Sequence, residues 1–199
     1  MQKALHQLKH PLALTVNFTP GDCSANDPQI QRLVNYTDGI LDEGGFSNEG
    51  DGYVTDTHWM DRVALMLHVQ QQRKVYYLVT TYAAVNPAGI QWALASYLMG
   101  KGHMSSLFIS TVQGYGADLP YNHYTAQIGS PLDGMYEAQY VYFREYSHGL
   151  SIVNPSSTTS YSVTLNPVNR YRDLNGEPVG QTVRMPPHSG LVLLTHPQA

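Results

Sequence analysis

The chain has 199 residues, a net charge of −4 and only 13% charged residues, against an average of about 25%. Because phosphate contacts need clustered Lys and Arg, so few cations exclude a dedicated nucleic-acid-binding protein. A hydrophobic content of 42% excludes a disordered chain, and the one cysteine, Cys23, excludes an intrachain disulfide and a cysteine-based zinc cluster.

Up to residue 133, strand-like and helix-like segments alternate. Strands are predicted at residues 12–18, 38–43, 74–81 and 104–111, and helices at 28–34, 58–72 and 86–99. Asp27-Pro28 is typical of a helix start, with Asp27 as the N-cap and Pro28 in the first turn. In the helix at 58–72, the apolar side is predicted to consist of Met60, Val63, Ala64, Leu67 and Val69.

This alternation, with a repeat of about 31 residues, predicts an α/β fold in which crossover helices join parallel strands. The strands are apolar runs rather than strictly alternating sequences, which indicates burial on both faces. Parallel βα units close into a barrel when there are eight, and four are predicted here. The residues alone leave two arrangements open, an open sheet or the second half of a barrel.

The pattern changes near residue 134. Six strands are predicted at residues 136–146, 150–154, 160–166, 170–174, 181–185 and 190–194. Asn175-Gly176 is the strongest short signal for a hairpin among the turns between them. The sequence therefore predicts two domains, residues 1–133 and a small antiparallel, β-sandwich-like accessory domain at 134–199.

The segment that precedes the first strand, residues 1–10, is interpreted as the end of a crossover helix. Its apolar residues Leu5 and Leu8 are expected to pack on a sheet. The same segment lacks the apolar core of a signal peptide, so none is predicted in this chain, and the question of a secreted longer form stays open. No apolar run reaches about 18 residues, so no membrane span is expected.

Several stretches carry a resemblance to a known protein type. They are residues 15–18 (TVNF), 36–46 (YTDGILDEGGF), 141–155 (VYFREYSHGLSIVNP), 171–176 (YRDLNG) and 186–194 (PPHSGLVLL). Together they resemble the C-terminal half of a glycoside hydrolase-like TIM barrel with its small C-terminal β-domain. The resemblance implies a partial (half) TIM-type βα barrel with four parallel strands. It also implies that one of two catalytic carboxylates belongs to the other half of the barrel.

Glu43 and Asp42 are the candidate catalytic residues, because they close the second strand at the end where barrel active sites lie. Cleavage of a glycosidic bond needs two carboxylates on opposite sides of that bond. Neighbouring strand residues point to opposite faces, so these two are not expected to form the pair together. Glu43 is preferred as the acid/base because Gly44-Gly45 permits a kink. A purely structural role for both carboxylates is the alternative.

Polar and aromatic residues near the other strand ends are candidates for binding sugar hydroxyls and for stacking on sugar rings. They are Asn17, Phe46, Tyr53, Trp59, Thr81, Tyr82, Gln113 and Tyr115. The 15 tyrosines also suit ordinary β-structure, and composition does not separate the two uses. The nine histidines show no metal-binding spacing, so no metal and no cofactor are expected.

Three functions are compatible with these residues. The first is a glycoside hydrolase, or its C-terminal half, that acts on a poly- or oligosaccharide. The second is a non-catalytic carbohydrate-binding remnant. The third is a half-barrel completed by a second copy or by a separate N-terminal half, because unpaired strand edges recruit partners. A carbohydrate is the expected ligand in the first two, and no nucleic acid or membrane partner is expected.

Overall fold

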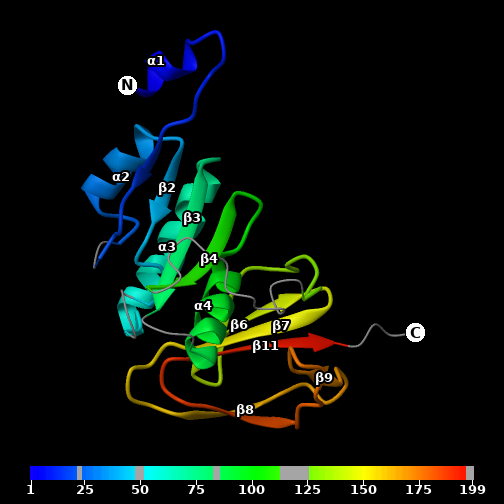
Figure 1. Ribbon diagram of the computed structural model, residues 1–199. Helices are drawn as coiled ribbons and strands as arrows, with labels where there is room; N and C mark the ends of the chain where they lie inside the picture. Colours follow the sequence, from blue (N-terminus) through cyan, green and yellow to red (C-terminus); the bar gives the residue numbers. More distant parts are fainter. Residues whose placement is uncertain (22–23, 48–51, 83–85, 113–125, 196–199) are drawn as a thin grey trace. The chain divides into compact units, whose positions relative to one another are not determined.

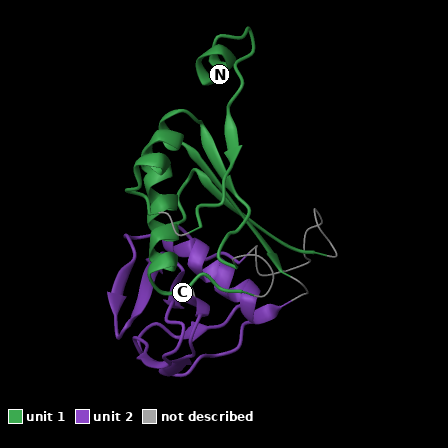
Figure 2. Cartoon of the chain, turned by 90° about the vertical axis from the view of Figure 1, so that its left-hand side faces the viewer, with its two compact units in different colours: residues 1–85, 100–118 green, residues 86–99, 119–199 purple. Residues whose placement is uncertain are grey.

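The computed structural model describes residues 1–21, 24–47, 52–82, 86–112 and 126–195. The chain forms two compact units (Figure 2). Unit 1 consists of residues 1–85 and 100–118, and unit 2 consists of residues 86–99 and 119–199. Within the described residues, no helix combines the length and apolar character needed to cross a membrane.

Unit 1 contains a four-stranded parallel sheet whose spatial order, β1-β2-β3-β4, follows the sequence (Figure 1). The strands are β1 (Thr15–Asn17), β2 (Gly39–Asp42), β3 (Val75–Tyr82) and β4 (Ser105–Thr111). The helices of this unit are α1 (Gln2–His6), α2 (Pro28–Asn35) and α3 (Asp56–Gln71). The predicted parallel strands with intervening helices are confirmed, and β1 is shorter than the predicted strand.

Helix α2 begins where the sequence predicts. The Asp27 side chain accepts a hydrogen bond from the Gln29 N–H at 2.7 Å, and Pro28 occupies the first turn, where its missing N–H costs nothing. Ile30 and Val34, four positions apart and therefore on one face, are buried. The predicted N-cap is confirmed.

Helix α3 has a different buried side from the one predicted. The buried residues are Trp59, Arg62, Val63, Leu65, Met66 and Val69. Ala64 is exposed and Leu67 is half-buried, so the predicted apolar side was wrong in part. The buried side also includes a charged residue, Arg62, which sequence hydrophobicity leaves out.

The interpretation of residues 1–10 as a helix that packs on a sheet was wrong. Helix α1 spans five residues and buries none of them, and Leu8 is 47% exposed. Polar contacts hold the segment instead. Asp38, just before β2, accepts hydrogen bonds from the Gln2 amide at 2.7 Å and the Leu14 N–H at 2.7 Å, and it contacts the His6 ring at 2.9 Å.

Strand β3 has two unlike faces. Tyr76, Leu78, Thr80 and Tyr82 are buried, whereas the residues between them are half-buried or exposed, Tyr77 at 40%. Helix α3 packs against β3 and supplies Arg62 to the side of the sheet that carries Tyr76. We call this side, opposite the one that carries Tyr77, the helix face.

Unit 2 combines one helix with two antiparallel sheets. The helix is α4 (Pro87–Gly100). The five-stranded sheet has the order β5-β6-β7-β11-β9, with β5 (Tyr136–Ala138), β6 (Val141–Tyr146), β7 (Gly149–Asn154), β9 (Tyr171–Arg172) and β11 (Ser189–Thr195). The two-stranded sheet pairs β8 (Tyr161–Thr164) with β10 (Thr182–Met185). Both sheets contribute to one core that includes Phe143, Ile152, Val163, Met185 and Leu193.

The predicted single strand at 136–146 was wrong. It is a hairpin of β5 and β6, closed by the pair Ala138–Val141, with Gln139 and Tyr140 as its two-residue turn. Both turn residues have a positive φ, 52° and 65°. Such turns favour Asn-Gly, so a Gln-Tyr turn gives no sequence signal. A turn forms at Asn175-Gly176, with Gly176 at φ +87° and its N–H bonded to the Asp173 carbonyl. The predicted hairpin of the two flanking strands was wrong, because β9 pairs with β11 and β10 pairs with β8.

Helix α4 groups with the antiparallel sheets, although its sequence continues the βα alternation. Its last carbonyls, of Leu98 and Met99, accept hydrogen bonds from the Arg144 guanidinium at 2.8 and 3.0 Å, and the Tyr146 hydroxyl donates to Leu98 at 2.6 Å. A cation at a helix C-terminus also opposes the negative end of the helix dipole. The compact units therefore divide the chain differently from the predicted division after residue 133.

Candidate active site

The carboxyl ends of the four parallel strands bring several predicted residues to one edge of unit 1. Asn17 ends β1, Asp42 ends β2 with Glu43 directly after it, and Thr81 and Tyr82 end β3. In βα-barrels and open α/β sheets, active sites lie at this edge. The surroundings of each side chain decide what it can do there.

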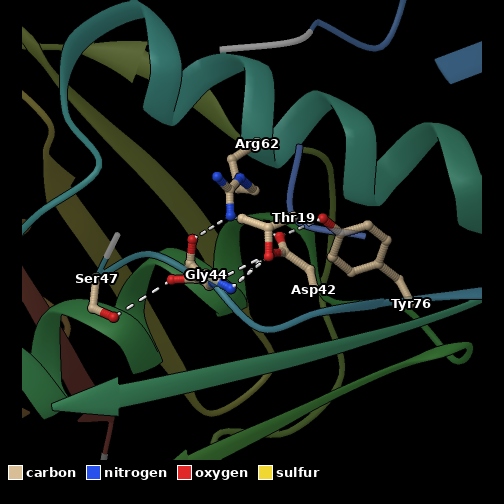
Figure 3. Close-up of polar contacts among 7 residues, drawn as sticks. Thr19, Asp42, Gly44, Ser47, Arg62 and Tyr76 are labelled. Carbon is tan, nitrogen blue, oxygen red and sulfur yellow. Dashed lines mark hydrogen bonds and ion pairs between the residues drawn. The ribbon is translucent and has the colours of Figure 1, made fainter. Parts of the chain in front are cut away.

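Asp42 is fully buried and is surrounded by donors (Figure 3). Its Oδ2 accepts hydrogen bonds from the Arg62 guanidinium and the Tyr76 hydroxyl, both at 2.7 Å. Its Oδ1 accepts from the backbone N–H groups of Gly44 at 3.1 Å and Gly45 at 3.2 Å. A carboxylate has about four acceptor positions, so all of them are filled within the protein.

The electrostatics of this cluster follow from its burial. Burial raises the pKa of the Asp42 carboxyl above its usual range, while the Arg62 charge, the Tyr76 hydroxyl and the Gly45 N–H act in the opposite direction. Burial, together with the Asp42 charge, raises the pKa of Tyr76 well above its usual value. Tyr76 therefore stays protonated and serves as a permanent donor to Asp42.

The same donors fix the bend after β2. Arg62 also donates to the Gly45 carbonyl at 2.6 Å, and the Gly44 N–H donates to the Thr19 hydroxyl at 3.2 Å (Figure 3). Gly45 has φ +52°, and a Cβ there would lie 2.1 Å from the Thr80 hydroxyl oxygen and 2.6 Å from the Val79 carbonyl. Glycine is therefore required at position 45, and the bend has one defined path.

Glu43 has different surroundings from Asp42. It is half-buried, and its side chain makes no hydrogen bond or ion pair with any other residue that the structure describes. Asp42 points to the helix face, where it meets Arg62, and successive strand residues alternate between faces. Glu43 follows the last residue of β2 and takes no part in the hydrogen bonds that join Asp42, Arg62 and Tyr76.

The predicted sugar-binding residues differ in how accessible they are. Phe46, Trp59 and Tyr82 are fully buried, so their rings have no exposed face in this structure. Asn17 is exposed, and Tyr53 and Thr81 are half-buried. Gln113 and Tyr115 lie outside the described residues, as does Cys23. Among the described members of the set, Asn17, Tyr53 and Thr81 can therefore contact a ligand without a rearrangement of the core.

Arg62 and Tyr76, which lie 20 and 34 residues from Asp42 along the chain, were not predicted from the sequence. One signal was available for Arg62, because it interrupts the apolar stripe of α3 between Trp59 and Val63. A charge on such a stripe indicates a buried partner. No comparable signal marks Tyr76, since a tyrosine in a buried strand is ordinary.

Metal-ligating residues do not gather in the part of the chain that the structure describes. No group of three or more His, Cys, Asp or Glu side chains is placed there to hold an ion. The polar chemistry of the described strand ends thus consists of carboxylates, hydroxyls and an amide. Such groups can exchange protons and bind hydroxyls.

Comparison with known proteins and protein families shows what this chain is similar to. A search of curated protein sequences found no match. A family model described as hypothetical glycosyl hydrolase family 15 matches residues 1–150, about three quarters of the chain. The matched region includes every strand of the parallel sheet, the Asp42–Arg62 cluster and Glu43, and it continues into the β5–β6 hairpin. The chain belongs to hypothetical glycosyl hydrolase family 15.

Proposed function

We propose that this protein hydrolyses glycosidic bonds of a poly- or oligosaccharide and that Glu43 is its acid/base residue. Membership in a glycosyl hydrolase family supports the reaction class. The second support is the sheet, in which four parallel strands follow one another in chain order. With right-handed crossovers, this order puts successive helices on the same face, as in a βα-barrel. The proposed fold is therefore part of a TIM-type barrel.

The single observation that carries the assignment is the contrast between two adjacent carboxylates. The acceptor positions of Asp42 are filled by Arg62, Tyr76 and two backbone N–H groups, so it has no capacity left for a substrate. Glu43 is half-buried at the carboxyl edge and has no partner among the described residues. Glu43 is thus the available acid, and Asp42 positions the bend that carries it.

In the proposed reaction, the Glu43 carboxylic acid donates its proton to the glycosidic oxygen as the bond to the anomeric carbon breaks. A second carboxylate, on the other side of the sugar, activates water or attacks the anomeric carbon itself. Asp42 is unsuited to that second role because its oxygens are occupied. We propose that the second carboxylate belongs to the part that completes the barrel, which is either a second copy of this chain or a separate half.

Substrate contacts are assigned to the accessible members of the predicted set. Asn17 and Thr81 offer an amide and a hydroxyl at the ends of β1 and β3, and Tyr53 offers a partly exposed ring. Hydroxyl and amide groups suit the hydroxyls of a sugar, and an aromatic ring suits its apolar C–H face. Gln113 and Tyr115 are kept as proposed contacts from the sequence alone.

The test is release of reducing ends from a panel of soluble glucans, xylans, mannans and chitooligosaccharides. Glu43→Gln is expected to lower kcat by roughly 10²–10⁴-fold without a change in the free energy of unfolding, because it removes an acid and leaves the packing intact. Asp42→Asn is expected to lower the free energy of unfolding, since it removes the charge that Arg62 faces. Glu177→Gln, an exposed residue of unit 2, is the matched control and should behave as wild type.

Two outcomes would overturn the assignment. Full activity of Glu43→Gln would remove Glu43 from the reaction. Binding of a polysaccharide by the wild type without turnover of any glycan would replace hydrolysis with the carbohydrate-binding function. Light scattering on the same samples measures whether two copies associate, as completion by a second copy requires.

A further inference from the structure

Unit 2 has an aromatic pair at the tip of the β5–β6 hairpin, remote in sequence from Glu43, in which Tyr140 is exposed and Tyr161 is half-buried. Tyr140, in the two-residue turn, is 76% exposed. Its ring stacks on that of Tyr161, the first residue of β8, with 5.5 Å between ring centroids and 19° between ring planes. A stack this close to parallel covers one face of the Tyr140 ring and leaves the other face open to solvent.

The turn is anchored so that the Tyr140 ring has a defined position. The Gln139 side chain accepts a hydrogen bond from the Thr164 N–H at 2.8 Å and donates to the Thr164 carbonyl at 3.0 Å. Its amide thus pairs with β8 as a strand neighbour would. With Gln139 bound to one end of β8 and Tyr140 stacked on the other, the hairpin tip is held at two points. A ring that is already ordered loses little freedom on binding.

The backbone of this turn is unfavourable for its residues. Gln139 and Tyr140 both have a left-handed backbone, with φ 52° and 65°. For a residue with a Cβ this conformation costs about 1–2 kcal/mol, and Asn-Gly would form the same turn without that cost. An unfavourable backbone conformation is a reason to look for a function of the residue that adopts it.

We propose that the open face of Tyr140 is a stacking site for a neutral oligo- or polysaccharide. The apolar C–H face of a sugar ring is complementary to a rigid aromatic face. The segments that form the tip, residues 138–141 (AQYV) and 161–164 (YSVT), contain no charged residue, and the nearest paired strand contributes one cation, Arg184, opposite Ser162. The hairpin also lies within the region matched by the glycosyl hydrolase family, residues 1–150.

This inference goes beyond the proposed hydrolysis, because it assigns a second carbohydrate contact that does not depend on Glu43. The test is native electrophoresis through gels that contain soluble β-glucan, xylan or amylose, with the full chain. Wild type is expected to be retarded by at least one of these polysaccharides. Tyr140→Gly is expected to weaken that retardation by about three- to tenfold, as for loss of an aromatic contact.

Tyr140→Gly is the informative variant, because glycine favours a positive φ and the fold is therefore retained or stabilised when the ring is removed. Tyr140→Phe keeps the ring and should be retarded like wild type. The matched control is Tyr36→Ala, which removes a tyrosine that is 65% exposed in unit 1 and outside any aromatic pair that the structure describes. It should leave the retardation unchanged.

Three results would overturn the proposal. The first is that no polysaccharide retards the wild-type protein, and the second is that Tyr140→Gly and wild type are retarded equally. The third is a change from dimer to monomer in Tyr140→Gly, which would make the aromatic pair a protein interface. Failure of the hydrolase proposal is recognised separately. Glu43→Gln should keep the retardation, and Tyr140→Gly should keep its turnover of short soluble substrates.

Discussion

Asp42 and Glu43 are neighbours in the chain, but their side chains have different surroundings. Asp42 is drawn into the helix face, where Arg62 of α3 and Tyr76 of β3 hold it. Glu43 follows the last residue of β2 and keeps a partly exposed side chain. A carboxylate that is fully bound stabilises the fold, whereas one with free acceptor positions can act on a ligand.

The Arg62–Asp42 pair gives the first prediction at this scale. Arg62→Met should lower the free energy of unfolding by about 3–5 kcal/mol, because it leaves a buried carboxylate without its cation. Urea denaturation measures the change. Arg32→Met is the control, since Arg32 is exposed on α2 of the same unit, and its effect should stay within about 0.5 kcal/mol. Equal effects of the two substitutions would contradict this account of the cluster.

Asp38 gives a prediction about acid stability. Burial acts to raise the pKa of the Asp38 carboxyl, but the Leu14 N–H, the Gln2 amide and the His6 ring outweigh it. Together they lower the pKa from 3.8 to about 2. The folded protein therefore holds this proton less tightly than the unfolded chain. The resulting stability is complete above about pH 4 and is lost as the pH falls towards 2.

The measurement is the free energy of unfolding of wild type and Asp38→Asn between pH 6 and pH 2. The advantage of wild type over the variant should be constant above about pH 4 and should shrink below it, because only wild type has the carboxylate to protonate. Parallel curves down to pH 2 would show that the contacts of Asp38 with α1 and Leu14 do not depend on its charge.

At the scale of elements, helix α4 shows how contacts override sequence position. Its Ala95 carbonyl accepts a hydrogen bond from the Ser151 hydroxyl at 3.1 Å, and its C-terminus is capped by Arg144 and Tyr146. Strand β11 approaches it so closely that a Cβ at Gly190 would lie 2.6 Å from the Ala95 Cβ and 2.9 Å from the Gln91 carbonyl. Helix and sheet thus meet at a glycine.

Gly190→Ala is therefore expected to lower the free energy of unfolding by about 1–3 kcal/mol, because an added methyl group forces α4 and β11 apart. Thermal denaturation followed by circular dichroism measures the loss. Gly134→Ala is the matched control, since no atom lies within 4 Å of the Cβ that it would add. If both variants melt at the wild-type temperature, α4 does not approach β11 as closely as described.

At the scale of the whole molecule, the chain passes between its two compact units more than once, after Val85, after Met99 and after Asp118. The family match, residues 1–150, also ends inside β7 (Gly149–Asn154) rather than between the units. A division of this protein into a barrel piece and an appended β-domain by sequence position alone would therefore separate α4 from the strands that it packs against.

This division can be measured with two fragments. Residues 86–199, which include α4 and also β4 of unit 1, should unfold at a higher urea concentration than residues 134–199, which lack the helix that Arg144, Tyr146 and Ser151 bind. The physical reason is the apolar surface of the sheet that loses its cover when α4 is removed. Equal midpoints for the two fragments would place α4 outside the unit.

Sequence alone determined several local elements of this protein. The N-cap at Asp27, the turn at Asn175-Gly176 and the positions of the parallel strands followed from residues close together in the chain, because caps, turns and apolar runs are short-range properties. It also placed both candidate carboxylates at a strand end. It favoured Glu43 because Gly44-Gly45 permits a kink, but strand alternation gives only the relative faces and not which face meets a helix.

Only the tertiary structure shows which partners each carboxylate has, through contacts between residues far apart in the chain. Arg62 and Tyr76 bind Asp42 from 20 and 34 residues away, and Ser151 binds α4 across 56 residues. Such pairings depend on how whole elements pack, and no local pattern encodes them. Tertiary contacts also decide the short turn at Gln139-Tyr140. Contacts with β8 stabilise a backbone conformation there that the turn's own residues disfavour.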